Sequence, residues 1–385
     1  MKRPICLSIF ALFGAAMTAI AQTATPPELI GNPATGKAVF KNEFPSVHGN
    51  GRSCATCHVP EEAFQLSPQN VEARYQALQE ARLTDPFADD PLFRSIDAND
   101  FASDFTNLRQ HALVRVIIKL PVDANGDKLV WPQDDPTATS VAVWRSTPSV
   151  LNTAFTAPYQ QDRRIATLQD QALGALDGHA EITRDPLPRF LNDIAAFQKG
   201  LFSSPAVQAL SNALDAGQVP PPTDPFLTPL ELEGKAQFLI HCTKCHGGPT
   251  QTLQLPTLGP GVRNIRVSKP VPPAVAHLPF APSPVPPRMW IFKGAPNPVP
   301  STDPGMALIS GNIAQLNFFD IPPLYGISKT APYFHDNSAA TLEDVLRHYQ
   351  SEFKAVDILA PPGANRPDPL PDEAIEPLAA YLKKI

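Results

Sequence analysis

The segments Cys54-Ala-Thr-Cys57-His58 and Cys242-Thr-Lys-Cys245-His246 decide how this sequence is interpreted. In each, two thiols stand three residues apart and a histidine follows, which is the spacing of a c-type haem attachment signal. On one helical turn such thiols reach the two vinyl groups of a haem, and the imidazole meets the iron as proximal ligand. The alternatives are a redox disulfide or half of a zinc site, but zinc needs a second Cys or His pair nearby. The sequence therefore predicts two covalently bound haem c groups, with His58 and His246 as proximal ligands.

The N-terminus has the features of a secretory signal over residues 1–21. Lys2 and Arg3 precede an apolar run that ends at Ala19-Ile20-Ala21, an A-x-A cleavage site. An uncleaved anchor is the alternative, but the run is short for a span of about 20 residues. Removal of the signal takes away Cys6 and leaves four cysteines, all in haem motifs. We expect an exported protein with no further membrane span, in a bacterial periplasm.

Composition limits the classes of protein to consider. The 385 residues suggest two domains on a prior of roughly 150 residues each, and 43% apolar residues can supply both cores. The 46 prolines make long regular helices improbable outside a few segments. A net charge of −6 argues against nucleic acid as a partner.

A helix is predicted directly before the second haem motif. Thr228-Pro-Leu-Glu231 has the pattern of a capping box with proline at the first helical position, and the helix should run through Gly234 to Ile240 towards Cys242. The other predicted helices are a weaker lead-in at 36–40 and two amphipathic segments at 190–201 and 374–385, which should close the two domains by packing on the haem motifs.

An internal repeat supports a division into two units. Thr156-Ala-Pro-Tyr159 recurs without a gap as Thr330-Ala-Pro-Tyr333, and the Asp and Ala-Thr-Leu that follow recur at the same offset. The predicted fold is mainly α and loop-rich, with two cytochrome-c-like domains derived from an internal duplication. The predicted boundaries are 22–218 for the first domain, 219–227 for a proline-rich linker and 228–385 for the second domain.

Two stretches differ between the halves. The first half has an insert-like stretch from about Gln65 to Trp144, and the second has a proline-dense run from Pro270 to Pro304. Because that run lies mid-domain and contains Trp290 and Phe292, we expect it to be an ordered wrapping loop rather than a disordered tail.

Several motifs of this sequence together resemble the bacterial dihaem cytochrome c peroxidase and MauG superfamily. They are the two haem motifs, the run from Arg145 to Asn152, and Thr330-Ala-Pro-Tyr-Phe-His-Asp336 followed by Thr341-Leu-Glu-Asp-Val345. The resemblance covers essentially the whole chain after the leader. It implies two cytochrome-c-like domains, with a peroxide-reactive haem in the first and an electron-transfer haem in the second. It also implies a calcium ion between them.

For the first haem, the resemblance implies that Gln171 and Glu181 form a polar pair in the distal pocket. Glu181 would move a proton between the oxygens of bound peroxide. The alternative is that Glu181 is a surface carboxylate. His179 would assist in this pocket or ligate the first iron in a resting state, and His111 is a rival for the second of these roles.

For the second haem, the resemblance places the distal ligand at Tyr349. Peroxidases of this type usually have methionine at this position, and MauG-like proteins have tyrosine. A phenolate would lower the haem potential, whereas a thioether would raise it. The alternative is that Tyr349 only packs and that a methionine ligates instead. The rivals are Met289 and Met306, with His335 and His348 behind them.

The calcium site implied by the resemblance consists of the Asn152 side chain and the backbone carbonyls of Thr330 and Pro332, which are oxygen ligands suited to a hard cation. Asn152 acting only as a turn cap is the alternative reading.

The chain departs from the family at the residue that would bridge the haems. Gln161 stands where the family has a tryptophan, and Ile240 stands where MauG-like proteins have another. An aromatic relay is therefore in question, and the candidate substitutes are Trp144, Trp290 and Tyr159.

The leading hypothesis is a haem peroxidase that reduces hydrogen peroxide to water. Electrons would come from a small periplasmic donor, such as a cytochrome c or a cupredoxin. MauG-like oxidation of a protein or other substrate through high-valent haem is the second hypothesis, favoured by Tyr349 and disfavoured by Gln161. The third is a non-catalytic dihaem electron carrier. The oligomeric state, including a homodimer, is left open.

Overall fold

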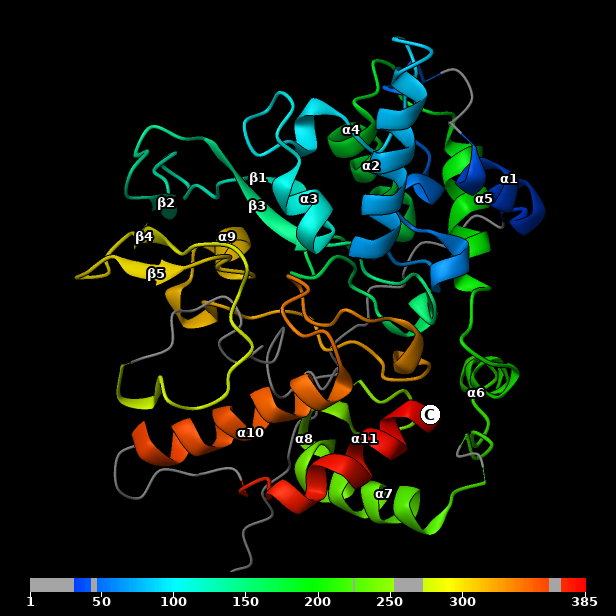
Figure 1. Cartoon of the computed structure of the whole chain (residues 1–385), viewed down its shortest axis with the longest axis vertical. Coiled ribbons are helices and arrows are strands. Elements are labelled where there is room, and N and C mark those ends of the chain that lie inside the picture. The colour runs from blue at the N-terminus through cyan, green and yellow to red at the C-terminus, as the bar shows by residue number, and fades with distance from the viewer. Residues whose placement is uncertain (1–30, 43–46, 224–225, 253–272, 360–367) are drawn as a thin grey trace, which may run out of the picture.

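The computed structural model describes residues 31–42, 47–223, 226–252, 273–359 and 368–385. The predicted leader lies outside these residues. The described part is mainly helical with long loops (Figure 1). Its α-helices are α1 (Pro33–Lys41), α2 (Pro68–Arg82), α3 (Thr106–His111), α4 (Leu168–Ala180), α5 (Pro188–Lys199), α6 (Pro205–Asp215), α7 (Pro229–His241), α8 (Thr243–His246), α9 (Ala307–Ser310), α10 (Leu342–Leu359) and α11 (Ile375–Lys384). Its strands are β1 (Leu113–Lys119), β2 (Val130–Pro132), β3 (Ser140–Ser146), β4 (Arg288–Phe292) and β5 (Val299–Ser301).

Each half contains a pair of helices that cross at a glycine. Helix α1 packs on α5 in the first half, and α7 packs on α11 in the second (Figure 1). A Cβ atom on Gly36 would lie 1.9 Å from the carbonyl oxygen of Asp193, and one on Gly234 would lie 1.9 Å from that of Pro377. Glycine is therefore what allows the two backbones to approach in both pairs.

The helix predicted before the second haem motif is confirmed as α7. Thr228 caps it: the Thr228 hydroxyl accepts from the Glu231 N–H, and the Glu231 carboxylate accepts from the Thr228 N–H at 2.6 Å. The segments predicted at 190–201 and 374–385 correspond to α5 and α11. In the first half, α5 is followed by α6, so it packs on the lead-in helix without being the last helix before the linker.

The two repeated blocks adopt the same local structure. Tyr159 and Tyr333 each follow a cis proline, and each makes an isolated antiparallel bridge, to Ile165 and Ala339 respectively. An α-helix then begins at the equivalent position of each block, at Leu168 in the first and at Leu342 in the second.

Two antiparallel sheets lie beside the helices. Strands β1 and β3 pair with Leu113 opposite Ser146, and a three-stranded sheet has the order β2-β4-β5. In the second sheet, Val130 lies opposite Phe292 and Arg288 lies opposite Ser301. The prediction of a wrapping loop over 270–304 is therefore wrong for β4 and β5, which form strands because β2, far away in the sequence, supplies their partner. This sheet crosses the predicted domain boundary (Figure 1).

A buried cluster of charges also joins the halves. The guanidinium of Arg145 donates to Asp162 at 2.6 Å and to Asp303 at 2.6 and 3.1 Å, and all three side chains are buried. Arg164 donates to the same Asp162 carboxylate. The opposite charges and the hydrogen bonds compensate the cost of burying these groups.

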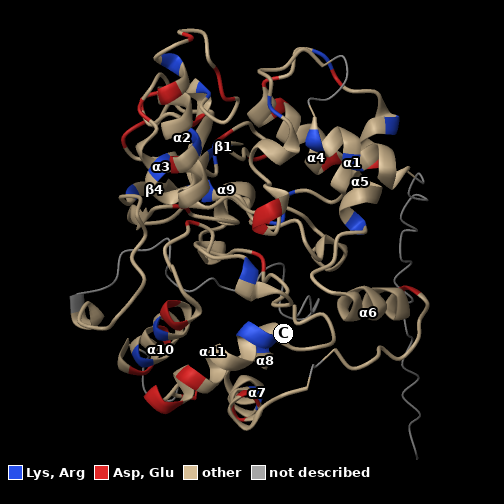
Figure 2. Ribbon diagram, turned by 45° about the vertical axis from the view of Figure 1, so that its right-hand side comes forward, with Lys and Arg blue, Asp and Glu red and all other residues tan. Residues whose placement is uncertain are grey.

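Lys and Arg are interspersed with Asp and Glu over the helices of both halves (Figure 2). Within the described ranges, every helix is too short or too polar to cross a bilayer.

Candidate haem centres

The two Cys-x-x-Cys-His segments have the same local geometry. All four cysteines are free thiols, and in each segment the histidine N–H donates to the carbonyl of the first cysteine at 2.8 Å. Each segment therefore forms one tight turn that places both thiols and the imidazole together. Burial raises the pKa of Cys54 and of Cys242 to about 12. All four cysteine side chains are half-buried.

Both proximal candidates have Nδ1 held by a backbone carbonyl. Nδ1 of His58 lies 3.2 Å from the Phe64 oxygen, and Nδ1 of His246 lies 3.0 Å from the Gln251 oxygen. Burial lowers the pKa of both imidazoles, that of His246 to about 4, and the carbonyls oppose this change. A neutral ring with Nδ1–H bound to a carbonyl presents Nε2 as a ligand.

A second backbone carbonyl interacts with each imidazole: that of Pro148 with His58 and that of Pro322 with His246. These prolines occupy equivalent positions of the internal repeat. The donor sets thus fit two c-type haems: each half offers two thiols that are not in a disulfide and one imidazole whose Nδ1 is held by a carbonyl. Among the described residues, no group of three or more His, Cys, Asp or Glu side chains is placed to hold a metal ion by itself.

Helix α4 presents one face with the polar residues implied for the first distal pocket. Gln171 and His179 are two helical turns apart, so they lie on neighbouring positions around the helix, and both are half-buried. Burial lowers the pKa of His179, and the His179 imidazole in turn lowers the pKa of His58. His179 is therefore close enough to the first proximal ligand to interact with it electrostatically.

Glu181 lies just past the end of α4, in a left-handed conformation with φ of 50°. Its side chain is exposed, and its carboxylate accepts a hydrogen bond from the Asn50 amide at 2.8 Å. Asn50 also donates to the His179 carbonyl, as does Arg52, which forms a buried ion pair with Asp97. The Glu181 carboxylate and the His179 main-chain carbonyl thus share Asn50 as a donor, whereas Gln171 is about 15 Å from Glu181 along the helix axis.

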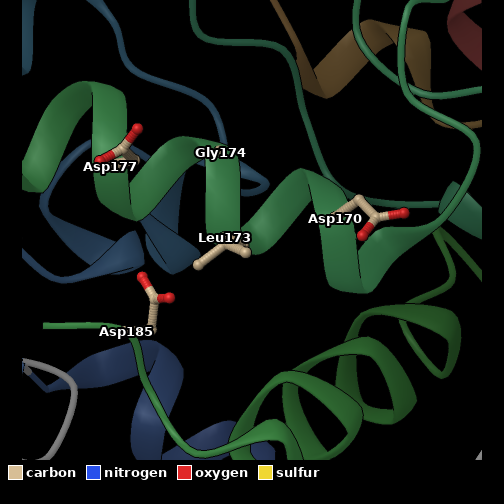
Figure 3. Close-up of a pocket in the computed structure, with 5 residues that line it drawn as sticks. All are labelled: Asp170, Leu173, Gly174, Asp177 and Asp185. Carbon is tan, nitrogen blue, oxygen red and sulfur yellow. The ribbon is translucent and has the colours of Figure 1, made fainter.

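An open pocket of about 340 Å³ lies on the opposite face of α4. Figure 3 shows Asp170, Leu173, Gly174 and Asp177 along the helix, with the Asp185 carboxylate on a neighbouring segment beside Leu173. Positions 170, 174 and 177 lie about half a turn around the helix from His179. This acidic pocket is therefore separate from the predicted distal side of the first haem.

Tyr349 lies beside the second haem motif. Its pKa is raised above the usual range, first by burial and then by the thiols of Cys245 and Cys242. Its ring contacts Phe334 and Phe353, with centroids 6.1 and 6.3 Å away. The rival methionines lie elsewhere, since Met289 is 40% exposed on β4 and Met306 precedes α9.

Two histidines that compete for the iron-ligand roles, His348 at the second haem and His111 at the first, are bonded to other parts of the protein. His348 is buried between Phe280 and Phe334, and its Nδ1 accepts from the Ala281 N–H at 3.1 Å. The carbonyl of His111 accepts from Asn337 of the second half, and burial lowers the pKa of this histidine.

Two of the three oxygens implied for calcium, those of Asn152 and Pro332, accept hydrogen bonds from the protein. The Asn152 amide oxygen accepts from the Ser203 N–H at 3.0 Å, and the Asn152 amide nitrogen donates to the Tyr325 carbonyl. The Pro332 carbonyl accepts from the Gln65 side chain at 2.9 Å. Asn152 is buried with a φ of 61°, and its side chain bonds to Ser203 and Tyr325 without capping the short helix that follows it.

The aromatic residues suggested as a relay belong to three separate packing environments. Trp290 belongs to the core of the three-stranded sheet, Trp144 stacks with Arg115, and Tyr159 packs on Leu168. A ring pair that sequence reasoning missed, Phe319 and His335, lies at the boundary between the halves. The repeat offered one signal for it, because His335 occupies the position of Gln161 in the second half.

Comparison with known proteins gives one family match, over residues 33–214, to the family described as di-haem cytochrome c peroxidase. Two of the similar solved structures are the following. One is a MauG-like protein associated with microbial copper homeostasis, 18% identical, with a TM-score of 0.47, covering 94% of this chain and 90% of that chain. The other is the diheme peroxidase BthA from Burkholderia thailandensis E264, 16% identical, with a TM-score of 0.46, covering 91% of this chain and 85% of that chain. Because both TM-scores are below 0.5, we draw nothing from these two similarities. Among curated protein sequences, none matches this chain.

Proposed function

Because residues 33–214 match the family described as di-haem cytochrome c peroxidase, we propose that this chain reduces hydrogen peroxide to water in its first half with electrons supplied through its second. Members of this family are oxidoreductases with two haem groups. The observation that carries the proposal is that Asn50, four residues before Cys54, donates to the Glu181 carboxylate and to the His179 carbonyl, which brings the end of α4 to the first haem motif.

The residues of the first half bind and protonate peroxide in this proposal. A haem held by Cys54, Cys57 and His58 supplies the redox change at the iron. Hydrogen peroxide, two electrons and two protons give two water molecules, so one proton must reach the far oxygen before the O–O bond breaks. Glu181 and His179 are the groups that hold and deliver this proton, and Asn50 orients the Glu181 carboxylate. Gln171, about 15 Å from Glu181 along the helix axis, is too far away to contact the same ligand and has no part in this step.

The residues of the second half receive electrons. Cys242, Cys245 and His246 would hold the electron-transfer haem, and Tyr349 would lie on its distal side. A small periplasmic cytochrome c or cupredoxin is the expected donor. This location depends on the predicted leader at residues 1–21, and export can be tested by sequencing the N-terminus of the mature protein.

The test compares peroxide turnover with a reduced small cytochrome as donor. Glu181→Gln and His179→Gln should each lower the rate by about 10²-fold, the usual contribution of positioned acid–base groups. Asp177→Asn, on the acidic outer face of α4, is the matched control and should leave the rate unchanged. Unchanged rates in both test variants would remove the acid–base roles. Two low-spin haems in the half-reduced protein with no peroxide turnover would reject the peroxidase and favour the electron carrier.

A second candidate function is MauG-like oxidation of a protein or other substrate, which Tyr349 favours because it lies beside Cys242 and Cys245. Addition of peroxide to the fully oxidised protein separates the two functions. A stable oxidised species that extends over both haems supports the second candidate, whereas rapid return to the resting spectrum with donor consumption supports peroxide reduction.

Two structural parts of the proposal have their own tests. A calcium ion held by Asn152, Thr330 and Pro332 should be removed by a chelator, with a lower Tm that added calcium restores. The duplication into units 22–218 and 228–385 is supported by the shared geometry of the two repeated blocks and by the glycine crossings at Gly36 and Gly234.

A further inference from the structure

Two buried rings of the second half, Phe319 and His335, lie face to face at the boundary between the halves. Their centroids are 4.1 Å apart and their planes differ by 25°, which is a stacked arrangement. Phe319 is 2% exposed and His335 is 5% exposed. The two rings are held from both sides by segments that lead to the candidate haem ligands.

On one side, the pair is connected to the second haem centre. Phe319 precedes Pro322 by three residues, and the Pro322 carbonyl lies on the imidazole of His246. Phe334, directly before His335, has its ring 6.1 Å from that of Tyr349. The pair is thus close in the chain to groups on both the proximal and the distal side of the second haem motif.

On the other side, the pair is connected to the first haem centre. The His335 carbonyl accepts a hydrogen bond from the Ser146 N–H at 2.7 Å, and the Ser146 hydroxyl donates to the Phe334 carbonyl at 3.2 Å. Ser146 precedes Pro148 by two residues, and the Pro148 carbonyl lies on the imidazole of His58. One route between the two proximal histidines therefore passes through the stacked rings, and a second runs from the Asp320 N–H to the Gln161 carbonyl at 2.7 Å and from the Gln161 amide to the Ser146 hydroxyl at 3.1 Å.

The surroundings keep the His335 ring neutral and in place. Burial lowers its pKa, and the neighbouring carboxylates of Asp336 and Asp303 only partly oppose this, with Arg145 acting in the same direction as burial. The guanidinium carbon of Arg145 lies 5.7 Å from the Phe319 ring, and its ion pair with Asp303 holds that side of the stack. A neutral imidazole stacks on phenylalanine without the cost of a buried charge.

We propose that the stacked rings of Phe319 and His335 are the electronic connection between the two haem centres, in place of a single bridging ring in the first half. Each passage moves one electron: the second haem is oxidised by one electron and the first is reduced by one, so two passages serve one peroxide. Transfer through bonded atoms and stacked rings is more efficient than transfer through empty space. This inference rests on the proposed function only in requiring two haems.

The test measures the rate of electron transfer between the haems in the protein loaded with both groups. One electron is introduced by flash photoreduction, and its redistribution is followed by absorbance. Phe319→Leu and His335→Leu remove a ring, whereas His335→Phe retains one. Phe292→Leu is the matched control, because it removes an equally buried ring from the core of the three-stranded sheet.

Both leucine variants should slow the transfer by about tenfold, equivalent to about 1.4 kcal/mol in the barrier. His335→Phe and Phe292→Leu should stay near the wild-type rate, and the reduction potentials of the two haems should be unchanged in all four variants. Wild-type transfer rates in both leucine variants would overturn the proposal, as would equal slowing in His335→Phe. This readout involves no peroxide. If the wild-type protein shows no peroxide turnover but both leucine variants transfer electrons more slowly, the proposed function is refuted and the electronic connection through the stacked rings is retained.

Discussion

Replacement of Gly234 by alanine tests whether the helix crossings are as tight as the structure indicates. Gly234 lies inside α7, where alanine would stabilise an isolated helix by about 1 kcal/mol. In the protein, however, the added Cβ would lie 1.9 Å from the Pro377 carbonyl oxygen and 2.9 Å from the Cβ of Tyr381. Real Cβ contacts are essentially never under 3.0 Å, so α7 and α11 must move apart by about 1 Å. Overpacking of this kind costs about 1–3 kcal/mol, and here it acts on backbone that cannot rotate away.

We therefore expect Gly234→Ala to lower the free energy of unfolding by about 1–2 kcal/mol after the gain in helix propensity. The matched control is Gly174→Ala in α4, where a Cβ would meet no heavy atom within 4 Å. That variant should be stabilised by up to about 1 kcal/mol. Thermal unfolding of both holoproteins, followed by circular dichroism, measures the difference. A Tm for Gly234→Ala equal to or above that of Gly174→Ala would refute the reasoning.

Three further outcomes are expected. Asp320→Asn should raise the Tm at pH 8 more than at pH 5. Burial raises the pKa of Asp320 from 3.8 to about 7, so the folded wild type loses stability as the pH rises between these values. A difference in Tm that does not depend on pH would contradict this. Asp303→Ala should lower the free energy of unfolding by about 3 kcal/mol, because it leaves the buried Arg145 guanidinium short of a partner. Asp134→Ala, at an ion pair on the surface, should lower it by less than about 1 kcal/mol. Equal decreases in urea titrations would show that burial does not matter here. Tyr349→Met should raise the potential of the second haem in spectroelectrochemical titrations, and an unchanged potential would argue that Tyr349 does not reach the iron.

Features that depend on a few neighbouring residues could be predicted from the sequence. The capping box at Thr228 and Glu231 is one such case, because both of its hydrogen bonds are made within one turn. The two Cys-x-x-Cys-His segments are another, since the motif defines its own local geometry. Tyr349 lies near the thiols of the second motif, and its role as distal ligand, which the family resemblance implies, stays a prediction.

Features that depend on distant partners could not be predicted. The sequence favours a loop for β4 and β5 because their prolines obscure the pattern and their partner, β2, lies far earlier in the chain. The stack of Phe319 on His335 was missed for the same reason, since His335 looks like one more candidate ligand until its neighbours are known. The exposure of Glu181 follows from where α4 ends, which its spacing from Gln171 does not reveal.

The sheet of β2, β4 and β5 also limits how this molecule can be taken apart. Expression of residues 22–218 alone would leave β2 with an open edge and expose the apolar side chains that Trp290 and Phe292 now cover. Expression of 228–385 alone would leave β4 with a missing neighbour. A monohaem fragment cut at the linker is thus a poor reagent for assigning spectra, and a chimera with a relative must exchange 130–132 and 288–301 together.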